Sequence, residues 1–176
     1  TLNRYQVKKV VTTCPHCFNT LRNEYPQLGG EFEVLHYTQF VDELIQDGRL
    51  KPVKAINEEV AYHDSCFLGR HNGIYDQPRN IARSIPGLKL VEIEPRCREK
   101  GFCCGAGGGH MFIDESQGTR INHMRTEQFL STGAQTIGVS CPFCLQMMEE
   151  GIDSKGVSGT KKARDILELL ADSLES

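Results

Sequence analysis

Apolar residues recur with alternating strand and helix spacing from residue 58 to the end of the chain. Three short apolar runs predict strands, at residues 60–63, 88–93 and 136–139. Stretches with apolar residues three and four positions apart predict helices at 74–85, at 115–131, after Cys144 and at 166–174. The order β–α–β–α–β–α predicts a parallel sheet covered by helices. The expected fold class is therefore α/β, with a Rossmann-like sheet.

The helix expected at 115–131 has Asp114 as its N-cap. Ile121 and Met124 are its expected core-facing residues. Residues 151–160 are polar and contain glycine, so they predict a break before the last helix. Lys161 and Lys162 are expected to be solvated helix residues.

Two segments far apart in the chain share one pattern. Residues 10–17 and 137–144 each combine a short apolar strand, a C-P-x-C sequence and the start of a helix. We therefore expect residues 1–50 to be the carboxy-terminal remainder of one repeat, 51–57 to be a connection, and 58–176 to be a complete second repeat. On this prediction the chain begins inside an earlier copy of the unit and is a fragment of a longer protein.

Five cysteines follow the expected strands in the pattern C-x36-CC-x36-C-x2-C, formed by Cys66, Cys103, Cys104, Cys141 and Cys144. Because the carboxyl ends of parallel strands meet at one edge of a sheet, these thiols are expected in one crevice. Thiolates grouped in this way select zinc, copper(I) or an iron–sulfur cluster. The vicinal pair favours a cluster, because two adjacent thiolates fit poorly around one tetrahedral ion but reach different irons.

A glycine-rich loop follows the vicinal cysteines. Gly105 and Gly107 are expected to let the backbone approach the sulfurs and point N–H groups at them. His63 has two interpretations of equal weight, one as a donor or proton relay at a cluster and one as a satisfied histidine at the end of a strand. Cys97 lies outside the pattern and is expected to be an incidental thiol rather than a substitute ligand.

Composition narrows the classes of function. The 176 residues carry a net charge of −3, which gives no reason to expect nucleic acid as a partner. A transmembrane helix needs about 18 consecutive apolar residues, and no apolar run in the sequence approaches that length. Eight cysteines without a secretion signal indicate a reducing compartment and metal binding rather than a disulfide scaffold.

These motifs resemble a known family. The pattern Cys66…Cys103-Cys104-Gly105…Cys141-Pro142-x-Cys144 resembles the cysteine-rich CCG domain found in heterodisulfide reductases and in the iron–sulfur subunits of glycolate oxidases. Residues 62–72, 103–108 and 120–123, together with Cys14-Pro15-His16-Cys17, resemble the carboxy-terminal part of the membrane-bound electron-transfer-flavoprotein:quinone oxidoreductase branch.

The resemblance implies a [4Fe–4S] cluster held by the five patterned cysteines, which is non-cubane in the best-studied relatives. Zinc is the alternative where the site is mis-metallated. Cys14 and Cys17 match the last two ligands of a first-repeat site that this chain cannot complete. The resemblance also implies an electron-transfer module in the cytoplasm at the inner face of the cell membrane. It would take electrons from an electron-transfer flavoprotein or another flavin subunit and pass them towards a membrane quinone or a disulfide.

Two other functions stay open from the residues alone. A zinc-stabilised structural or docking module would use the same cysteines. A thioredoxin-like dithiol oxidoreductase would use Cys14-Pro15-His16-Cys17, because a helix start lowers the pKa of a thiol. The recurrence of that motif as Cys141-Pro142-Phe143-Cys144 argues against the second of these functions.

Overall fold

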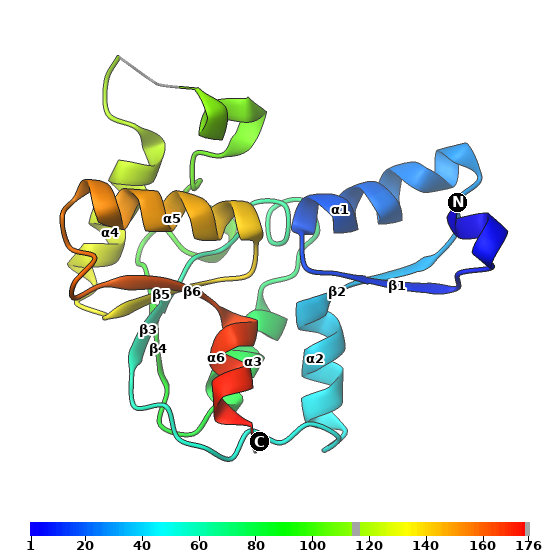
Figure 1. Cartoon of the computed structure of the whole chain (residues 1–176), viewed down its shortest axis with the longest axis horizontal. Helices are drawn as coiled ribbons and strands as arrows, with labels where there is room; N and C mark the ends of the chain where they lie inside the picture. Colours follow the sequence, from blue (N-terminus) through cyan, green and yellow to red (C-terminus); the bar gives the residue numbers. More distant parts are fainter. Residues whose placement is uncertain (114–116, 175–176) are drawn as a thin grey trace.

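A four-stranded parallel sheet forms the centre of the fold, in the order β4-β3-β5-β6. The computed structural model describes residues 1–113 and 117–174 (Figure 1). The strands are β3 (Glu59–Tyr62), β4 (Lys89–Glu92), β5 (Thr136–Val139) and β6 (Lys162–Asp165). The expected α/β class, with a parallel sheet flanked by helices, is confirmed.

Helices cover both faces of this sheet. One face is covered by α4 (Ile121–Ser131) and α5 (Pro142–Ser154), and the other by α3 (Asp76–Ser84) and α6 (Ile166–Ser173). Successive side chains of β3 point to opposite faces, because a strand has a side-chain period of two. Ala61 packs into the core under α4 and α5, whereas Val60 and Tyr62 pack into the core under α3 and α6. Helices thus cover both faces of the sheet, and this packing holds the carboxyl ends of the strands in position relative to one another.

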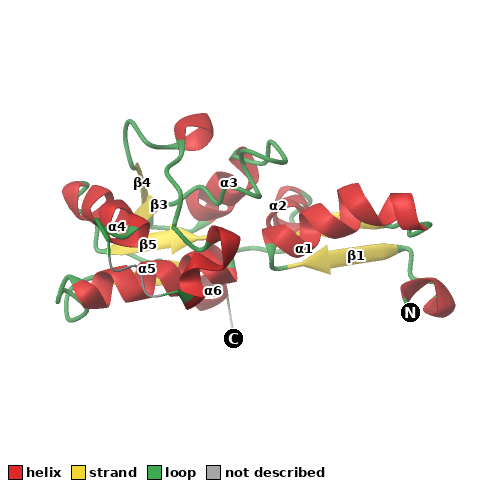
Figure 2. Cartoon of the chain, turned by 90° about the horizontal axis from the view of Figure 1, so that it is seen from above, coloured by secondary structure: helices red, strands yellow, loops and turns green. Residues whose placement is uncertain are grey.

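A smaller unit precedes this sheet and lies beside it (Figures 1 and 2). It contains the parallel pair β1 (Lys9–Thr12) and β2 (Glu33–His36), with α1 (Pro15–Asn19) and α2 (Tyr37–Gln46). One turn of π-helix (Thr20–Glu24) continues α1, and short 3-10 helices occupy Leu2–Tyr5, Tyr25–Leu28 and Arg98–Lys100. The segment Gly107–Phe112 forms 3-10 turns that are interrupted at Gly108 and Gly109. No helix among the described residues is both long and apolar enough to cross a bilayer.

Apolar contacts join the smaller unit to the sheet. Phe18 and Val34 form one buried cluster with Leu68 and Ile74, which belong to the region after β3. Helix α2 packs on α3 within the core of the larger sheet. The connection between the units is held by the Ser173 carbonyl, which accepts two backbone N–H groups at 2.9 Å each.

Three expectations about helix boundaries are wrong. Lys162 lies in β6 rather than in the last helix, and α5 continues to Ser154 through part of the expected break. Helix α4 begins at Ile121, with Arg120 as its N-cap, rather than near residue 115. The expected cap, Asp114, lies outside the described residues.

The expected inner face of α4 is also wrong. Ile121 and Met124 are 38% and 40% exposed, whereas Asn122, Arg125, Thr126 and Phe129 are buried. The polar side chains can face inward because each finds a partner there. The Asn122 amide, for example, donates to the Met147 carbonyl at 3.3 Å, and the Thr126 hydroxyl donates to the Asn122 carbonyl at 2.8 Å.

Gly151 of α5 lies against the backbone and a side chain of α4. A Cβ at this position would lie 2.1 Å from Thr126 Oγ1 and 3.2 Å from the Asn122 carbonyl oxygen. Thr126 Oγ1 cannot move aside without losing its hydrogen bond, so we expect Gly151→Ala to lower the free energy of unfolding by about 1–3 kcal/mol. Urea denaturation measures the change. Gly159→Ala is the matched control, because a Cβ there meets no atom within 4 Å. Equal stability of the two variants would contradict the close approach.

Candidate metal centre

The patterned cysteines all lie beyond the carboxyl ends of strands of the larger sheet. Cys66 follows β3, the Cys103-Cys104 pair lies in the loop after β4, and Cys141 follows β5. Helix α5 starts at Pro142 with Cys141 as its N-cap, which places Cys144 in its first turn.

The thiols of these loops lie against one another. The Cys144 thiol donates to Cys104 Sγ at 3.5 Å, and the Gly105 backbone N–H donates to Cys103 Sγ at 3.3 Å. Hydrogen bonds with Cys104 and Cys66 hold the pKa of Cys103 well below its usual range. The bond with Cys103 in turn raises the pKa of Cys66. The hydrogen bonds from its neighbours therefore favour the thiolate form of the half-buried Cys103.

Cys141 extends the group at its other end. Its hydrogen bond with Cys144 lowers the pKa of Cys141 below the ordinary value for a thiol. Cys104, Cys141 and Cys144 are buried, and every cysteine is a free thiol. The structure thus brings all five patterned cysteines into contact, in the order Cys66, Cys103, Cys104, Cys144 and Cys141.

The two predicted loop glycines differ in their surroundings. Gly105 has a φ of +92°, and a Cβ there would lie 3.1 Å from Ile121 Cβ and 3.2 Å from the Asn122 backbone nitrogen. Its conformation and its close approach to α4 both favour glycine. A Cβ on Gly107 would meet no atom within 4 Å. The described structure therefore gives no steric reason for glycine at that position.

The first C-P-x-C sequence lies against the second. His16 Nδ1 is 3.7 Å from Cys14 Sγ. Hydrogen bonds with Cys14 and, to a smaller extent, with Cys141 raise the pKa of His16 to about 9. The His16 ring also packs on Phe143, with the ring centroids 5.1 Å apart. Cys17 is exposed. The structure thus brings Cys14 to the edge of the five-cysteine group, with His16 between them.

Three buried polar atoms near the thiols have no hydrogen-bond partner among the described residues, namely His63 Nε2, Ser65 Oγ and Arg125 Nη2. One ring nitrogen of His63 lies within 4.8 Å of Sγ of both Cys104 and Cys144. A buried polar group left unpaired costs about 1–3 kcal/mol. A bound group rich in sulfur would supply acceptors for the unpaired donors. The residues present therefore fit an iron–sulfur group.

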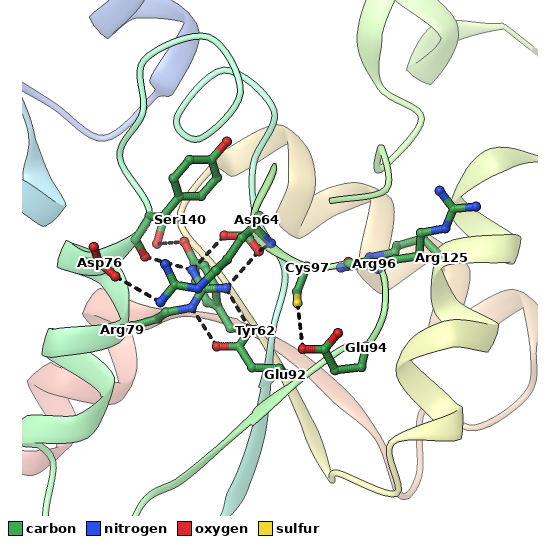
Figure 3. Close-up of polar contacts among 12 residues, drawn as sticks. Tyr62, Asp64, Asp76, Arg79, Glu92, Glu94, Arg96, Cys97, Arg125 and Ser140 are labelled. Carbon is green, nitrogen blue, oxygen red and sulfur yellow. Dashed lines mark hydrogen bonds and ion pairs between the residues drawn. The ribbon is translucent and has the colours of Figure 1, made fainter. Parts of the chain in front are cut away.

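A fully buried arginine holds the segment that precedes Cys66. Arg79 of α3 donates two hydrogen bonds to the Asp64 carboxylate, at 2.8 and 2.9 Å, and two to the Glu92 carboxylate, at 2.7 and 2.8 Å (Figure 3). Its fifth N–H donates to a backbone carbonyl at 2.8 Å. Asp64 also accepts the backbone N–H of Arg98 at 2.6 Å. This network joins α3, the end of β3 and the loop after β4.

Cys103 is reached from solvent through an opening with basic walls. The cavity has a volume of about 610 Å³, and its lining includes Cys103, Ile121, Arg70, Arg96 and Lys100. In the described part of the chain, neither Arg96 nor Lys100 forms an ion pair. Basic side chains without an ion-pair partner among the described residues therefore line the route to the sulfur.

Cys97 has a partner of its own outside the thiol group. Its thiol donates to Glu94 Oε1 at 3.3 Å (Figure 3). Burial and this hydrogen bond raise the pKa of Cys97 to about 11. Cys97 is thus a protonated thiol at neutral pH, held by a carboxylate.

Sequence reasoning did not identify Arg79 or Arg125, although both are buried beside the loops of the centre. Arg79 reaches partners 15 and 13 positions away, and Arg125 reaches His63 across 62 positions. No local spacing marks such pairs. The sequence offered one signal for such partners, which is the segment His63-Asp64-Ser65. Polar residues directly after a buried strand need buried hydrogen-bond partners elsewhere in the fold.

Comparison with known proteins gives consistent matches. Residues 60–149 match the family CCG, described as "Cysteine-rich domain". The chain is 46% identical over 180 residues to EtfAB:quinone oxidoreductase of Syntrophomonas wolfei, an alignment that covers 98% of this chain and 25% of that protein. It is 48% identical over 168 residues to "Probable iron-sulfur-binding oxidoreductase FadF" of Bacillus subtilis, covering 96% and 24%.

A relative from an archaeon is more distant. The chain is 38% identical over 176 residues to one of the subunits of dihydromethanophenazine:CoB–CoM heterodisulfide reductase of Methanosarcina barkeri, covering 98% of this chain and 42% of that one. The chain thus spans 24–42% of the length of these relatives. It is homologous to a domain of oxidoreductases, which confirms the resemblance seen in the motifs. The matched residues include all five patterned cysteines, and the chain belongs to the CCG cysteine-rich domain family.

Proposed function

We propose that this chain is an iron–sulfur electron-transfer module of a larger oxidoreductase. The observation that carries the proposal is the contact of five thiols from three loops at one edge of the sheet. The proposed ligands of a [4Fe–4S] cluster are Cys66, Cys103, Cys104, Cys141 and Cys144. Gly105 is proposed to contribute its backbone N–H.

The donor set favours a cluster over a single zinc ion. A structural zinc site takes four ligands in a tetrahedron, whereas five thiols are in contact here. Cys103 and Cys104 are also adjacent in the chain, so their sulfurs are better suited to different metal atoms than to one. The unpaired donor on His63 and the one on Arg125 support a group that carries acceptors beyond the thiolates.

When bound, such a cluster supplies one-electron redox chemistry. The residues of this chain hold it, exclude water from it and offset its charge. Helices α4 and α5 bury three of the sulfurs. Arg125 places a guanidinium near Cys104 and Cys144, although burial lowers its pKa to about 10. Hydrogen bonds, charge and burial are the properties that tune the potential of an iron–sulfur centre.

Partners of the whole protein are proposed from the relatives' names. The relative EtfAB:quinone oxidoreductase supports an electron-transfer flavoprotein, or another flavin subunit, as the electron donor and a membrane quinone as the acceptor. The heterodisulfide reductase relative supports a disulfide as the alternative acceptor. If the acceptor is a membrane quinone, the module works in the cytoplasm at the inner face of the cell membrane. The basic opening over Cys103 suits the approach of an acidic donor surface.

Reversing charge at this opening is expected to slow electron delivery. In the full protein, Arg96→Glu combined with Lys100→Glu should lower the second-order rate with reduced electron-transfer flavoprotein about tenfold at low ionic strength, because steering by charge is lost. Stopped-flow rates at several salt concentrations measure this effect. Lys51→Glu combined with Lys54→Glu makes the same change in net charge on the exposed connection. An equal loss in that control would contradict docking at the opening.

Cys14 and Cys17 are proposed as part of a second metal site. The chain has no other cysteine before Cys66, so these two cannot complete a cluster of their own. A dithiol function is the rival for this pair. Burial raises the pKa of Cys14, but the hydrogen bond with His16 and nearby backbone N–H groups outweigh burial and lower it overall.

Metal analysis of the protein prepared without oxygen tests the proposed function. About four irons and four sulfides per chain, with an electron paramagnetic resonance signal that responds to redox poise, would support it. Zinc without sulfide would overturn it in favour of a structural module. Dithiol reductase activity that survives loss of Cys66, Cys103 and Cys104 would favour the Cys14–Cys17 pair.

A further inference from the structure

His63 is held by a partner that can only donate. The ring follows β3 directly and is buried, and its Nδ1 lies 3.0 Å from Nε of Arg125. A guanidinium has five N–H donors and no acceptor. Nδ1 of His63 must therefore present its lone pair, which leaves the proton of the neutral ring on Nε2. Burial and, to a smaller extent, the charge of Arg125 lower the pKa of His63 to about 3, which agrees with a neutral ring.

Arg125 is itself fixed, so this tautomer is imposed by the fold. Its Nη1 donates to the Arg96 carbonyl at 3.0 Å and to Gln128 Oε1 at 2.8 Å. These bonds tie the guanidinium to its own helix and to the loop after β4. The Nε–H group consequently stays aimed at the histidine.

The Nε2–H group of His63 then has no partner among the described residues. One ring nitrogen lies within 4.8 Å of Sγ of Cys104 and of Cys144, and Nδ1 is already occupied by Arg125. A buried donor in this position requires an acceptor. The sulfurs of Cys104 and Cys144 are acceptors within reach of the ring.

We propose that Arg125 locks His63 as an Nε2–H donor to the sulfurs of the group held by Cys104 and Cys144, and that His63 is not a ligand of that group. A metal-bound imidazole nitrogen must offer a lone pair, and the free lone pair of this ring is used by Arg125. The proposal rests on the proposed function for the identity of the group. His63 and Arg125 are positioning residues, and a hydrogen bond to sulfur stabilises the more negative, reduced form.

The tautomer is tested in the metal-free protein. With 15N-labelled histidine, nuclear magnetic resonance should show the His63 proton on Nε2 and an unprotonated Nδ1. In Arg125→Leu the Nε2–H preference should be reduced or lost. A proton on Nδ1 in the wild type would overturn the proposed arrangement, whatever metal the protein later binds.

The effect on the bound group is tested by redox titration followed by electron paramagnetic resonance. His63→Leu removes the donor and should lower the midpoint potential by about 59 mV, a tenfold shift in the ratio of oxidised to reduced centre. His63→Gln keeps an N–H donor and should recover part of the shift, with iron content unchanged in both variants. His123→Leu, on the same helix as Arg125, is the control.

Each result on the bound group decides one question. An unchanged potential in His63→Leu would overturn the donor role, and loss of iron in both His63 variants would identify a ligand instead. If His63→Leu does not fold, the difference in midpoint potential between His63→Gln and the wild type still tests the donor role. A wild type without iron and sulfide would overturn the proposed function, and the tautomer measurement would remain valid.

Discussion

Serine at both Cys103 and Cys104 is expected to reduce the iron and acid-labile sulfide of anaerobically purified protein from about four of each per chain to less than about one. Cys103 contacts Cys66, and Cys104 contacts Cys144, so this pair links the thiols of the other two loops. A serine hydroxyl is a harder and weaker ligand for iron than a thiolate. Chemical assays of iron and sulfide, with an electron paramagnetic resonance spectrum, measure the loss.

Cys97→Ser is the matched control for this experiment. It makes the same chemical change in the same loop, but the Cys97 thiol is bonded to Glu94 rather than to the thiol group. Iron and sulfide should therefore stay at the wild-type level. Retention of both in the Cys103 and Cys104 double variant, or their loss in the Cys97 variant, would contradict the ligand assignment. Circular dichroism of both proteins establishes that each remains folded.

Replacing Arg79 with methionine is expected to lower the free energy of unfolding by about 3–5 kcal/mol. Methionine has a similar length but no donors, so it leaves the buried Asp64 carboxylate without its main counter-ion and leaves Glu92 half-buried beside it. Urea denaturation of the metal-free protein measures this loss without a contribution from metal binding.

Lys89→Met provides the comparison for Arg79→Met. Lys89 pairs with Glu59, and their side chains are 71% and 44% exposed. Exposed pairs contribute little, so this variant should be close to the wild type in stability. A small effect at Arg79 as well would mean that water replaces the guanidinium, and the network would then not hold the Cys66 segment in place.

Strands and cysteine-bearing loops could be predicted from the sequence because their signals are local. The apolar runs of β3 and β5 mark buried strands, and each leads directly into a loop that carries a cysteine. Strand β6 could not be predicted in this way. Its residues, Lys162-Ala163-Arg164-Asp165, are mostly charged, and the strand forms because β5 offers an unpaired edge.

The prediction of the inner face of α4 failed for a different reason. Apolar periodicity selected Ile121 and Met124, yet the helix buries Asn122, Arg125 and Thr126. Their burial depends on acceptors supplied by α5, by the loop after β4 and by the end of β3. A pattern of hydrophobic positions contains no information about such partners. The same limit concealed the link between Arg125 and the centre.

The two outer strands of the larger sheet limit how another copy of the unit, such as the earlier repeat predicted from the sequence, could associate with it. β4 carries Lys89 and Glu92, and β6 carries Lys162 and Arg164, so both free edges bear charged side chains. Charged edge strands resist pairing with a strand from another chain or domain. A neighbouring repeat is therefore expected to keep its own sheet and to meet this one through helices and loops, as the β1–β2 pair does. Tandem copies would then face each other across their cysteine-bearing ends without merging into one continuous sheet, and the same edges would protect the isolated module from aggregation.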